Sequence, residues 1–132
     1  MTSIKELMRS GSENPVVSSR SCMRDVIEMM DAKKLGAICV IEEERLVGIF
    51  TDGDLRRLIL KTQDTLPDIF MKKIEKHMTT SPKVISPGKS LQDCLLVMTK
   101  NRFWVIPVVG DQNRLLGIVH MQDLITKLID KG

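Results

Sequence analysis

Residues 48–57 read Gly-Ile-Phe-Thr-Asp-Gly-Asp-Leu-Arg-Arg, and residues 117–124 repeat the skeleton as Gly-Ile-Val-His-Met-Gln-Asp-Leu. In each copy a glycine is followed by an apolar stretch, and an Asp-Leu pair begins six residues after that glycine. The pattern predicts a strand that passes through a turn into the first turn of a helix. We name these two stretches the first and the second junction.

The aspartates of the two junctions, Asp54 and Asp123, have two possible roles. A carboxylate in the first turn of a helix complements the positive end of the helix dipole and caps free amides. Alternatively, the carboxylate holds a polar ligand, since it can accept several hydrogen bonds beside the strand end. A pure cap requires no particular partner three residues earlier, whereas Thr51 and His120 occupy that position here. The repetition therefore favours a ligand site.

The repetition extends over most of the chain. Four apolar positions of a predicted helix recur in identical phase 68 residues later, as Met23, Val26, Ile27 and Met30 and then Leu91, Cys94, Leu95 and Met98. Strand, turn, strand and helix follow in the same order, at 37–41, 46–51 and 54–61 and then at 105–109, 115–119 and 122–129. The short segments 4–8 and 74–78 also correspond. This is the pattern of a tandem duplication.

The duplication predicts an α/β (α+β) fold of two β-α-β-β-α repeats, residues 1–68 and 69–132, packed about a pseudo-twofold axis. One junction is expected on each side of the cleft between the two sheets. The polar stretch 62–73 is interpreted as the connection. At the helix ends, we expect Ser21 as an N-cap, Gly36 as a C′ residue and Ser90 in a capping box.

Composition limits the possible functions. The 132 residues are 42% apolar but only 3% aromatic, which predicts one module with an aliphatic and methionine core. The net charge of +3 is mild, and Tyr is absent, so nucleic acid is not an expected partner. No secretory signal and no apolar run long enough to span a bilayer occur in the sequence. We therefore expect a cytoplasmic protein without a membrane partner.

Catalytic and metal-binding patterns are absent from the sequence. The histidines, His77 and His120, have no Ser, Cys or metal-ligand companion at a recognisable spacing. The three cysteines, Cys22, Cys39 and Cys94, show no CxxC spacing and are expected to be buried, reduced thiols. We predict no catalytic residues and no metal site, so the chain is not expected to be an enzyme by itself.

The repeated junction, together with the β-α-β-β-α order, resembles a tandem pair of cystathionine-β-synthase (CBS) domains, or Bateman module, over about residues 4–129. The first junction and the His-containing second junction are also similar to those of bacterial arabinose-5-phosphate isomerases, which act in the pathway to the lipopolysaccharide sugar Kdo. In that family an N-terminal sugar-isomerase (SIS) domain carries catalysis. The resemblance implies that this chain is the regulatory part of such a protein, with the catalytic domain preceding it.

The resemblance also implies a ligand and the residues that bind it. CBS pairs bind adenosine nucleotides such as AMP, ADP or ATP, and the isomerase resemblance adds CMP-Kdo as an effector; no cofactor is required. Asp54 would accept both ribose hydroxyls, and Thr51 would bond the sugar or phosphate. Arg56 and Arg57 either face solvent or bind an anionic group. Of the two junctions, the first is the expected nucleotide site.

Further ligand-lining positions follow from the resemblance alone. For the Asp54 site they are Val84, Ile85, Trp104 and Val105, and for the site of His120 and Asp123 they are Val16, Val17, Gly36 and Ala37. Trp104 itself is either a core residue or a half-exposed residue of the cleft.

Two functions of different classes are consistent with these observations. The first is a ligand-sensing regulatory module that modulates an attached isomerase domain. The second is a structural module that forms a homodimer through its helices and has vestigial pockets. Catalysis by this chain itself ranks last, because no catalytic residues are recognisable.

Overall fold

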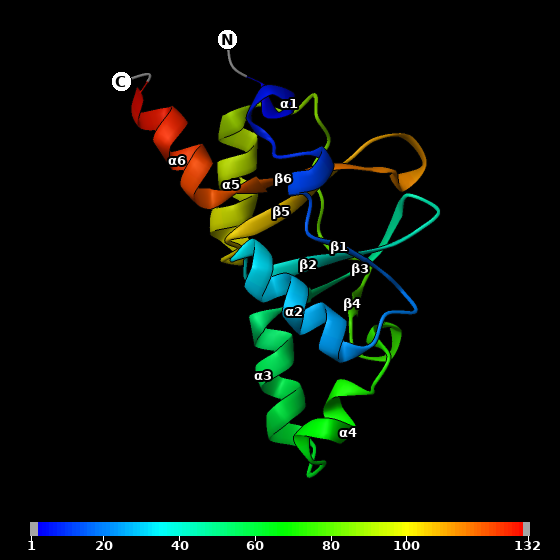
Figure 1. The fold of residues 1–132 in the computed structure, drawn as a ribbon. Helices are drawn as coiled ribbons and strands as arrows, with labels where there is room; N and C mark the ends of the chain where they lie inside the picture. Colours follow the sequence, from blue (N-terminus) through cyan, green and yellow to red (C-terminus); the bar gives the residue numbers. More distant parts are fainter. Residues whose placement is uncertain (1–2, 131–132) are drawn as a thin grey trace. The chain divides into compact units, whose positions relative to one another are not determined.

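The structure, a computed structural model, describes residues 3–130 apart from the side chain of Ser12. These residues form two compact units, each containing both helices and strands, so the predicted mixed fold class is confirmed. The central unit is Pro15–Pro82. The terminal unit combines the described residues up to Asn14 with those from Lys83 onward. Figure 1 shows the elements of each unit along the chain.

The central unit is built on a four-stranded sheet in the order β1-β2-β3-β4. Its strands are β1 (Val16–Ser18), β2 (Ala37–Glu42), β3 (Arg45–Thr51) and β4 (Thr79–Thr80). β1 pairs with β2 in parallel, and the other pairs are antiparallel. The helical elements are α2 (Met23–Lys33), α3 (Asp52–Lys61), α4 (Leu66–Phe70) and the short 3-10 helix η2 (Ile74–Lys76). α2 packs on β2 and α4, and α3 packs on β3.

The core of the central unit follows from the alternation along β3. Leu46, Gly48 and Phe50 are buried, while the residues between them are partly exposed, as expected for a strand with one covered face. The Phe50 side chain is fully buried and belongs to a cluster with the apolar face of α2 and with Ile69 of α4. This packing holds β3 in place up to its last residue, where α3 begins.

The terminal unit repeats this plan with a shorter sheet. Its elements are α1 (Ile4–Leu7), η1 (Gly11–Glu13), α5 (Leu91–Asn101), β5 (Val105–Val109), η3 (Asp111–Asn113), β6 (Leu115–His120) and α6 (Met121–Asp130). β5 and β6 form an antiparallel pair. Single bridges join Ile85 to Val108 in parallel and Arg9 to Ile118 in antiparallel orientation. Ile85 and Arg9 therefore take the places that β1 and β4 have in the central unit.

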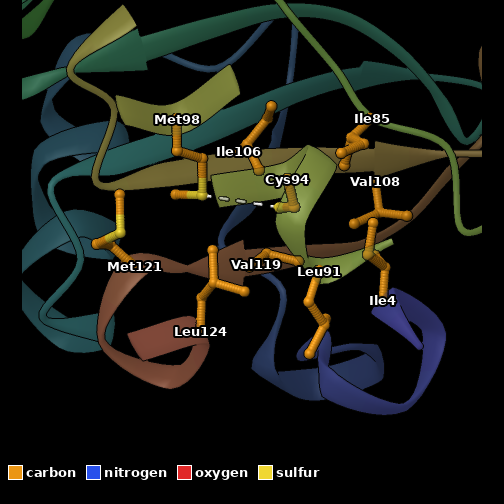
Figure 2. Packing of buried hydrophobic residues seen from close by; sticks show 10 residues of the cluster. All are labelled: Ile4, Ile85, Leu91, Cys94, Met98, Ile106, Val108, Val119, Met121 and Leu124. Carbon is orange, nitrogen blue, oxygen red and sulfur yellow. Dashed lines mark hydrogen bonds between the residues drawn. The ribbon is translucent and has the colours of Figure 1, made fainter. Parts of the chain in front are cut away.

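Figure 2 shows the core of the terminal unit, which is aliphatic and sulfur-rich as composition predicts. Leu91, Cys94 and Met98 of α5 face the strands, and Cys94 Sγ lies 3.8 Å from Met98 Sδ. Ile4, fully buried, joins this cluster from the N-terminal segment. Its apolar side chain ties the N-terminal segment to the second repeat.

The compact units are divided differently from the sequence repeats. Gly48 of β3 approaches Met78 and Thr79, while Gly117 of β6 approaches the equivalent residues Met8 and Arg9. Each short segment that precedes a repeat thus packs on the other repeat. The boundary at residues 68 and 69 concerns the sequence repeats and stays a prediction for them, whereas the compact units divide after Asn14 and after Pro82.

Two local predictions need correction. The N-cap of α2 is Cys22 and not Ser21, whose backbone carbonyl instead accepts a bond from the Ile74 N–H at 2.9 Å. α2 ends at Lys33, and its C-cap Lys34 adopts the left-handed conformation with φ 54°, so Gly36 is not the C′ residue. Position 36 instead requires glycine because there is no room for a side chain: a Cβ there would lie 2.9 Å from Asp52 Oδ2.

Two further details extend the predictions. At α5, Ser90 Oγ accepts a bond from the Asp93 N–H at 3.0 Å, which is the serine half of the expected capping box. The connection 62–73 contains the helix α4, which was not predicted. Its signals were present in the sequence, because Thr65 caps the helix and Pro67 stands in its first turn.

The close approaches at the two strand glycines predict a graded loss of stability on substitution by alanine. A Cβ at Gly117 would lie 2.4 Å from the Arg9 carbonyl oxygen, and this backbone atom cannot move aside easily. A Cβ at Gly48 would meet the flexible Met78 side chain first, at 2.4 Å. We expect Gly117→Ala to lower the free energy of unfolding by about 1–3 kcal/mol, and Gly48→Ala by less.

Urea unfolding followed by circular dichroism measures this order. Gly88→Ala is the control, because a Cβ there would contact nothing within 4 Å. An equal loss for Gly117→Ala and Gly88→Ala would contradict the proposed packing of the N-terminal segment on β6.

Candidate functional site

The first junction has no loop between strand and helix. Thr51 is both the last residue of β3 and the N-cap of α3. Its Oγ1 accepts a hydrogen bond from the Asp54 N–H at 3.2 Å, and the Thr51 N–H donates to Asp54 Oδ2 at 3.0 Å. This reciprocal pair is a capping box, in which the aspartate takes the usual place of a glutamate. The helix-capping role that the sequence suggested for Asp54 is therefore confirmed.

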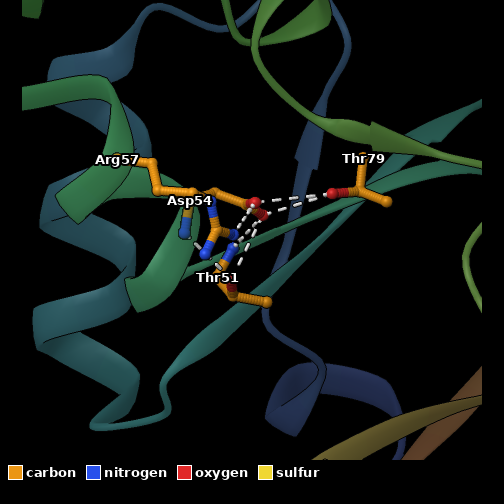
Figure 3. Close-up of polar contacts among 4 residues, drawn as sticks. All are labelled: Thr51, Asp54, Arg57 and Thr79. Atoms are coloured by element: carbon orange, nitrogen blue, oxygen red, sulfur yellow. Dashed lines mark hydrogen bonds and ion pairs between the residues drawn. The ribbon is translucent and has the colours of Figure 1, made fainter. Parts of the chain in front are cut away.

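The Asp54 carboxylate does more than cap the helix, as Figure 3 shows. Arg57 Nη2 donates to Oδ1 at 2.7 Å, and the Thr79 hydroxyl of β4 lies 3.4 and 3.5 Å from the two carboxylate oxygens. Only 12% of the Asp54 side chain is exposed. The carboxylate is therefore held in one position at the edge of the sheet, with donors from three elements around it.

The two arginines after the junction differ in placement. The Arg57 side chain folds back over the first turn of α3, since a Cβ at Gly53 would lie 3.2 Å from its Nη1. It remains 57% exposed in spite of its ion pair with Asp54. Arg56 is exposed on the helix surface. Arg57 therefore belongs to the site, whereas the position of Arg56 fits the solvent-facing alternative.

The second junction has the same backbone plan and different side chains. His120 ends β6 directly before α6, and its Nδ1 accepts a hydrogen bond from the Gln122 N–H at 3.1 Å. Arg9 holds Asp123 with two bonds, from Nε to Oδ2 at 2.8 Å and from Nη2 to Oδ1 at 3.2 Å. Asp123 thus has a fixed cationic partner from the N-terminal segment.

Electrostatics keep His120 neutral near pH 7. Burial lowers the pKa of His120 below its usual value, the nearby Arg9 guanidinium lowers it further, and Asp123 opposes both effects. The hydrogen bond to Asp123 raises the pKa of Arg9, which stays charged. Since Nδ1 accepts a bond, the neutral imidazole carries its proton on Nε2.

The other predicted lining residues occupy strand ends and bridges within their own units. In the central unit, Ala37 pairs with Thr51, and the Gly36 carbonyl accepts a bond from the Asp52 N–H at 3.0 Å. In the terminal unit, Val105 pairs with His120, and the Trp104 carbonyl accepts a bond from the Met121 N–H at 2.8 Å. The remaining members, which lie on or beside a parallel pairing, are Val16, Val17, Val84 and Ile85.

Each set therefore lies in a different compact unit from the aspartate for which it was predicted. The role of these residues against a ligand stays a prediction. Trp104 has 73% of its surface exposed, so the core alternative is wrong for this residue.

Sequence reasoning missed Arg9 and Thr79. Both residues directly follow the corresponding segments 4–8 and 74–78, and both contact the aspartate of the adjacent junction. The sequence did contain a signal for these two residues. If the correspondence of segments 4–8 and 74–78 is extended by one residue, Arg9 and Thr79 occupy equivalent positions. Nothing in the local sequence, however, shows which junction each segment approaches.

The predictions for cysteines, metals and membrane segments concern the rest of the chain. Cys39 and Cys94 are buried free thiols, and burial raises their pKa to about 12 and about 11, whereas Cys22 is half-buried. Within residues 3–130, no three His, Cys, Asp or Glu side chains are grouped to hold a metal ion. No helix in that range has the length and apolar character needed to cross a bilayer.

The family model of the CBS domain matches residues 4–61 and again residues 71–130. This chain belongs to the CBS-domain family. It carries two CBS domains, as the duplicated junction predicted, and the resemblance to a Bateman module is confirmed. The SIS-CBS isomerase resemblance is supported by curated relatives.

The curated relatives match this CBS pair to one part of longer proteins. Arabinose 5-phosphate isomerase KdsD of Francisella tularensis is 35% identical over 92% of this chain, and KdsD of Escherichia coli K12 is 32% identical over 92%. An uncharacterized protein of Rickettsia prowazekii is 38% identical over 96%. The chain spans only 36% to 38% of the length of these three proteins.

Solved structures show the same fold. CBSX2, crystallised in complex with AMP, superimposes with a TM-score of 0.85 at 24% identity, covering 99% of this chain and 98% of that one. Protein MJ1225 from Methanocaldococcus jannaschii gives a TM-score of 0.87 at 22% identity, over 96% of this chain and 47% of that one. At these identities the likeness establishes the CBS-pair fold.

The helix-capping role of His120 predicts a pH-dependent stability. Because its pKa is lowered in the folded state, the unfolded chain binds the proton more readily. The stabilisation is complete above pH 6.5 and is lost as the pH falls through the folded-state pKa. His77, whose pKa is lowered by burial and by Lys72 and Lys76, acts in the same direction.

Urea unfolding at pH 7.5 and pH 5.5 tests this prediction. His120→Asn keeps a cap acceptor that does not titrate, so it should reduce the acid-induced loss by up to about 1 kcal/mol. His77→Asn separates the second contribution. If acid lowers the free energy of unfolding by the same amount in wild type and in the variant that combines His120→Asn with His77→Asn, neither histidine is responsible.

Proposed function

We propose that this CBS pair is a regulatory module that binds a nucleotide or nucleotide-sugar at the first junction and modulates an attached sugar-phosphate isomerase domain. The observation that carries the proposal is the Asp54 carboxylate, which is fixed at 12% exposure at the edge of the sheet and is contacted by two donors outside the cap, Arg57 and Thr79. The ligand classes are adenosine nucleotides and CMP-Kdo, which share a ribose diol and a phosphate.

A ribose diol suits Asp54 because a carboxylate only accepts hydrogen bonds and has about four lone-pair directions. The Thr51 N–H at 3.0 Å and the Thr51 hydroxyl at 3.1 Å both donate to Oδ2, and both belong to the cap, so they stay in place. The Thr79 hydroxyl, at 3.4 Å or more, holds the carboxylate only weakly. The ligand hydroxyls would replace this contact and the bond from Arg57.

Arg57 gives the same site an anion-binding group. Its side chain is 57% exposed and makes one bond to Asp54, so rotation about its own torsions would release it into solvent. A phosphate or a sugar carboxylate would then receive the guanidinium, since its planar fork matches either anion. Binding would thus exchange an internal ion pair for two ligand contacts, the diol on Asp54 and the anion on Arg57.

The comparisons support the class of the ligand and the parent activity. One structural neighbour, CBSX2, was crystallised with AMP. The KdsD relatives are named arabinose 5-phosphate isomerases, and the chain covers only 36% of their length. We infer that the parent protein is a cytoplasmic isomerase of lipopolysaccharide synthesis, with its catalytic residues outside this chain. CMP-Kdo, a downstream product of such a pathway, is the effector that this parentage favours.

The first test compares melting temperatures of wild type and Asp54→Ala with AMP, ADP, ATP, CMP and CMP-Kdo. A ligand at a hundredfold excess over its dissociation constant stabilises the fold by about 2.7 kcal/mol, so an effector raises the wild-type melting temperature clearly. We expect a shift with at least one of these compounds and its loss in Asp54→Ala.

Asp68→Ala is the matched control for this test. Asp68 stands three residues after the N-cap Thr65 in the same unit, and its N–H donates to Thr65 Oγ1 at 3.4 Å, as the Asp54 N–H donates to Thr51 Oγ1. It therefore reports the loss of a first-turn carboxylate away from the junction. If both variants lose the shift equally, or if no compound shifts the wild type, the sensor function at Asp54 is wrong.

A homodimerisation module is a second candidate, and the exposed apolar side chains of three helices favour it. Leu60 of α3 is 77% exposed and Ile129 of α6 is 70% exposed, so both helices present large aliphatic side chains to solvent. Ile59, Leu96 and Ile125 add to the exposed set. We propose that these helices form the contact between two copies of the chain.

Sedimentation velocity tests the dimer. Leu60→Glu and Ile129→Glu should each raise the dimer dissociation constant by at least about tenfold, because a buried charge without a partner opposes association. Ala32→Glu, on the exposed surface of α2, which is not one of these helices, is the control for added negative charge. A wild type that sediments as a monomer, or a dimer unaffected by both glutamates, would contradict this candidate.

A further inference from the structure

We propose that Arg9 closes the second junction to hydroxyl-bearing ligands, so that one residue of the N-terminal segment decides which of the two junctions can bind. This inference deepens the proposed function and rests on it. It concerns contacts within each unit taken by itself.

The first support is the geometry of the pair. Arg9 Nε donates to Asp123 Oδ2 at 2.8 Å, and Nη2 donates to Oδ1 at 3.2 Å, so both carboxylate oxygens are engaged by one planar fork. The side chains are 32% and 29% exposed, and the pair is thus partly shielded from water. A ligand diol would need the same two oxygens. To reach them, it would have to separate a bidentate, charge-assisted contact.

The second support is the anchoring of the Arg9 backbone. The Arg9 N–H donates to the Ile118 carbonyl at 2.8 Å, and the Ile118 N–H donates to the Arg9 carbonyl at 2.9 Å. Gly117 lets this segment come close, because a Cβ there would lie 2.4 Å from the Arg9 carbonyl oxygen. The Arg9 backbone is therefore fixed against β6, and this position places the guanidinium beside Asp123.

The central unit provides the internal comparison. There Thr79 takes the place of Arg9, pairing with Ile49 of β3 as Arg9 pairs with Ile118 of β6. Its neutral hydroxyl stands 3.4 Å or more from the Asp54 carboxylate, a contact that a ligand hydroxyl can replace. The cation at Asp54 is instead Arg57, which is 57% exposed and makes a single bond. Ligand hydroxyls can therefore reach the Asp54 carboxylate of the first junction, whereas Arg9 blocks the Asp123 carboxylate of the second.

The equivalence of Arg9 and Thr79 makes exchange variants the direct test. Arg9→Thr gives the second junction the side chain found in the first, and Thr79→Arg gives the first junction the side chain found in the second. Isothermal titration calorimetry with AMP and with CMP counts the sites in each variant. Arg24→Thr is the control for the lost charge, because Arg24 forms an exposed pair with Glu28 on α2.

We expect one binding event per chain in wild type and in Arg24→Thr, and two in Arg9→Thr, the second of which is removed by Asp123→Ala. We also expect Thr79→Arg to weaken the wild-type binding by about tenfold or more, as for the loss of a charge-assisted bond. Melting curves establish that each variant is folded. If Arg9→Thr is not folded, Thr79→Arg still decides the proposal: unchanged affinity overturns it.

The outcomes separate this inference from the proposed function. Gain of a site in Arg9→Thr, with no binding in wild type, supports closure by Arg9 but contradicts the Asp54 site. Binding in wild type that Arg9→Thr does not increase supports the sensor and overturns closure. Wild-type binding that is lost in Asp123→Ala also overturns closure. No binding by either protein overturns both.

Discussion

The direct passage from strand to helix at Thr51 is the constraint on which the site depends. One residue ends β3 and caps α3, so the first turn of the helix is placed by the sheet and not by a flexible loop. The capping box at 3.0 and 3.2 Å then fixes the Asp54 carboxylate relative to the strand end. A ligand group that binds Asp54 thereby contacts an element whose position is set by the buried core under Phe50.

In the proposed function the same carboxylate serves stability and binding, and the two roles compete only in part. The bond from the Thr51 N–H satisfies the helix start and would persist with a ligand present. The bonds from Arg57 and Thr79 are peripheral to the cap. Their loss costs little when a ligand replaces them, because a buried or half-buried carboxylate needs donors but not particular ones. This is why a helix cap can also be an exchangeable site.

Duplication has preserved the backbone at both junctions while the side chains diverged. Thr51 and His120 both accept a bond from the first turn of the following helix, through Oγ1 and Nδ1 respectively. The strand glycines Gly48 and Gly117 remain because a neighbouring segment packs directly against each of them. The polar residue that this segment delivers to the aspartate is under no such packing constraint, and it is Thr in one unit and Arg in the other.

Local pattern determined much of this protein. The apolar phase of the helices, the strand pairs and the Asp-Leu junctions follow from side-chain periodicity and capping, which act over a few residues. The duplicated fold and the capping role of Asp54 could therefore be predicted from the sequence. The α4 helix was missed because its polar context resembled a linker, and Gly36 was misassigned because its cause is contact with Asp52. Only the tertiary structure brings Arg9 to Asp123, across 114 residues, and Thr79 to Asp54. Those partners depend on which segment packs on which sheet, a long-range choice that no local periodicity encodes.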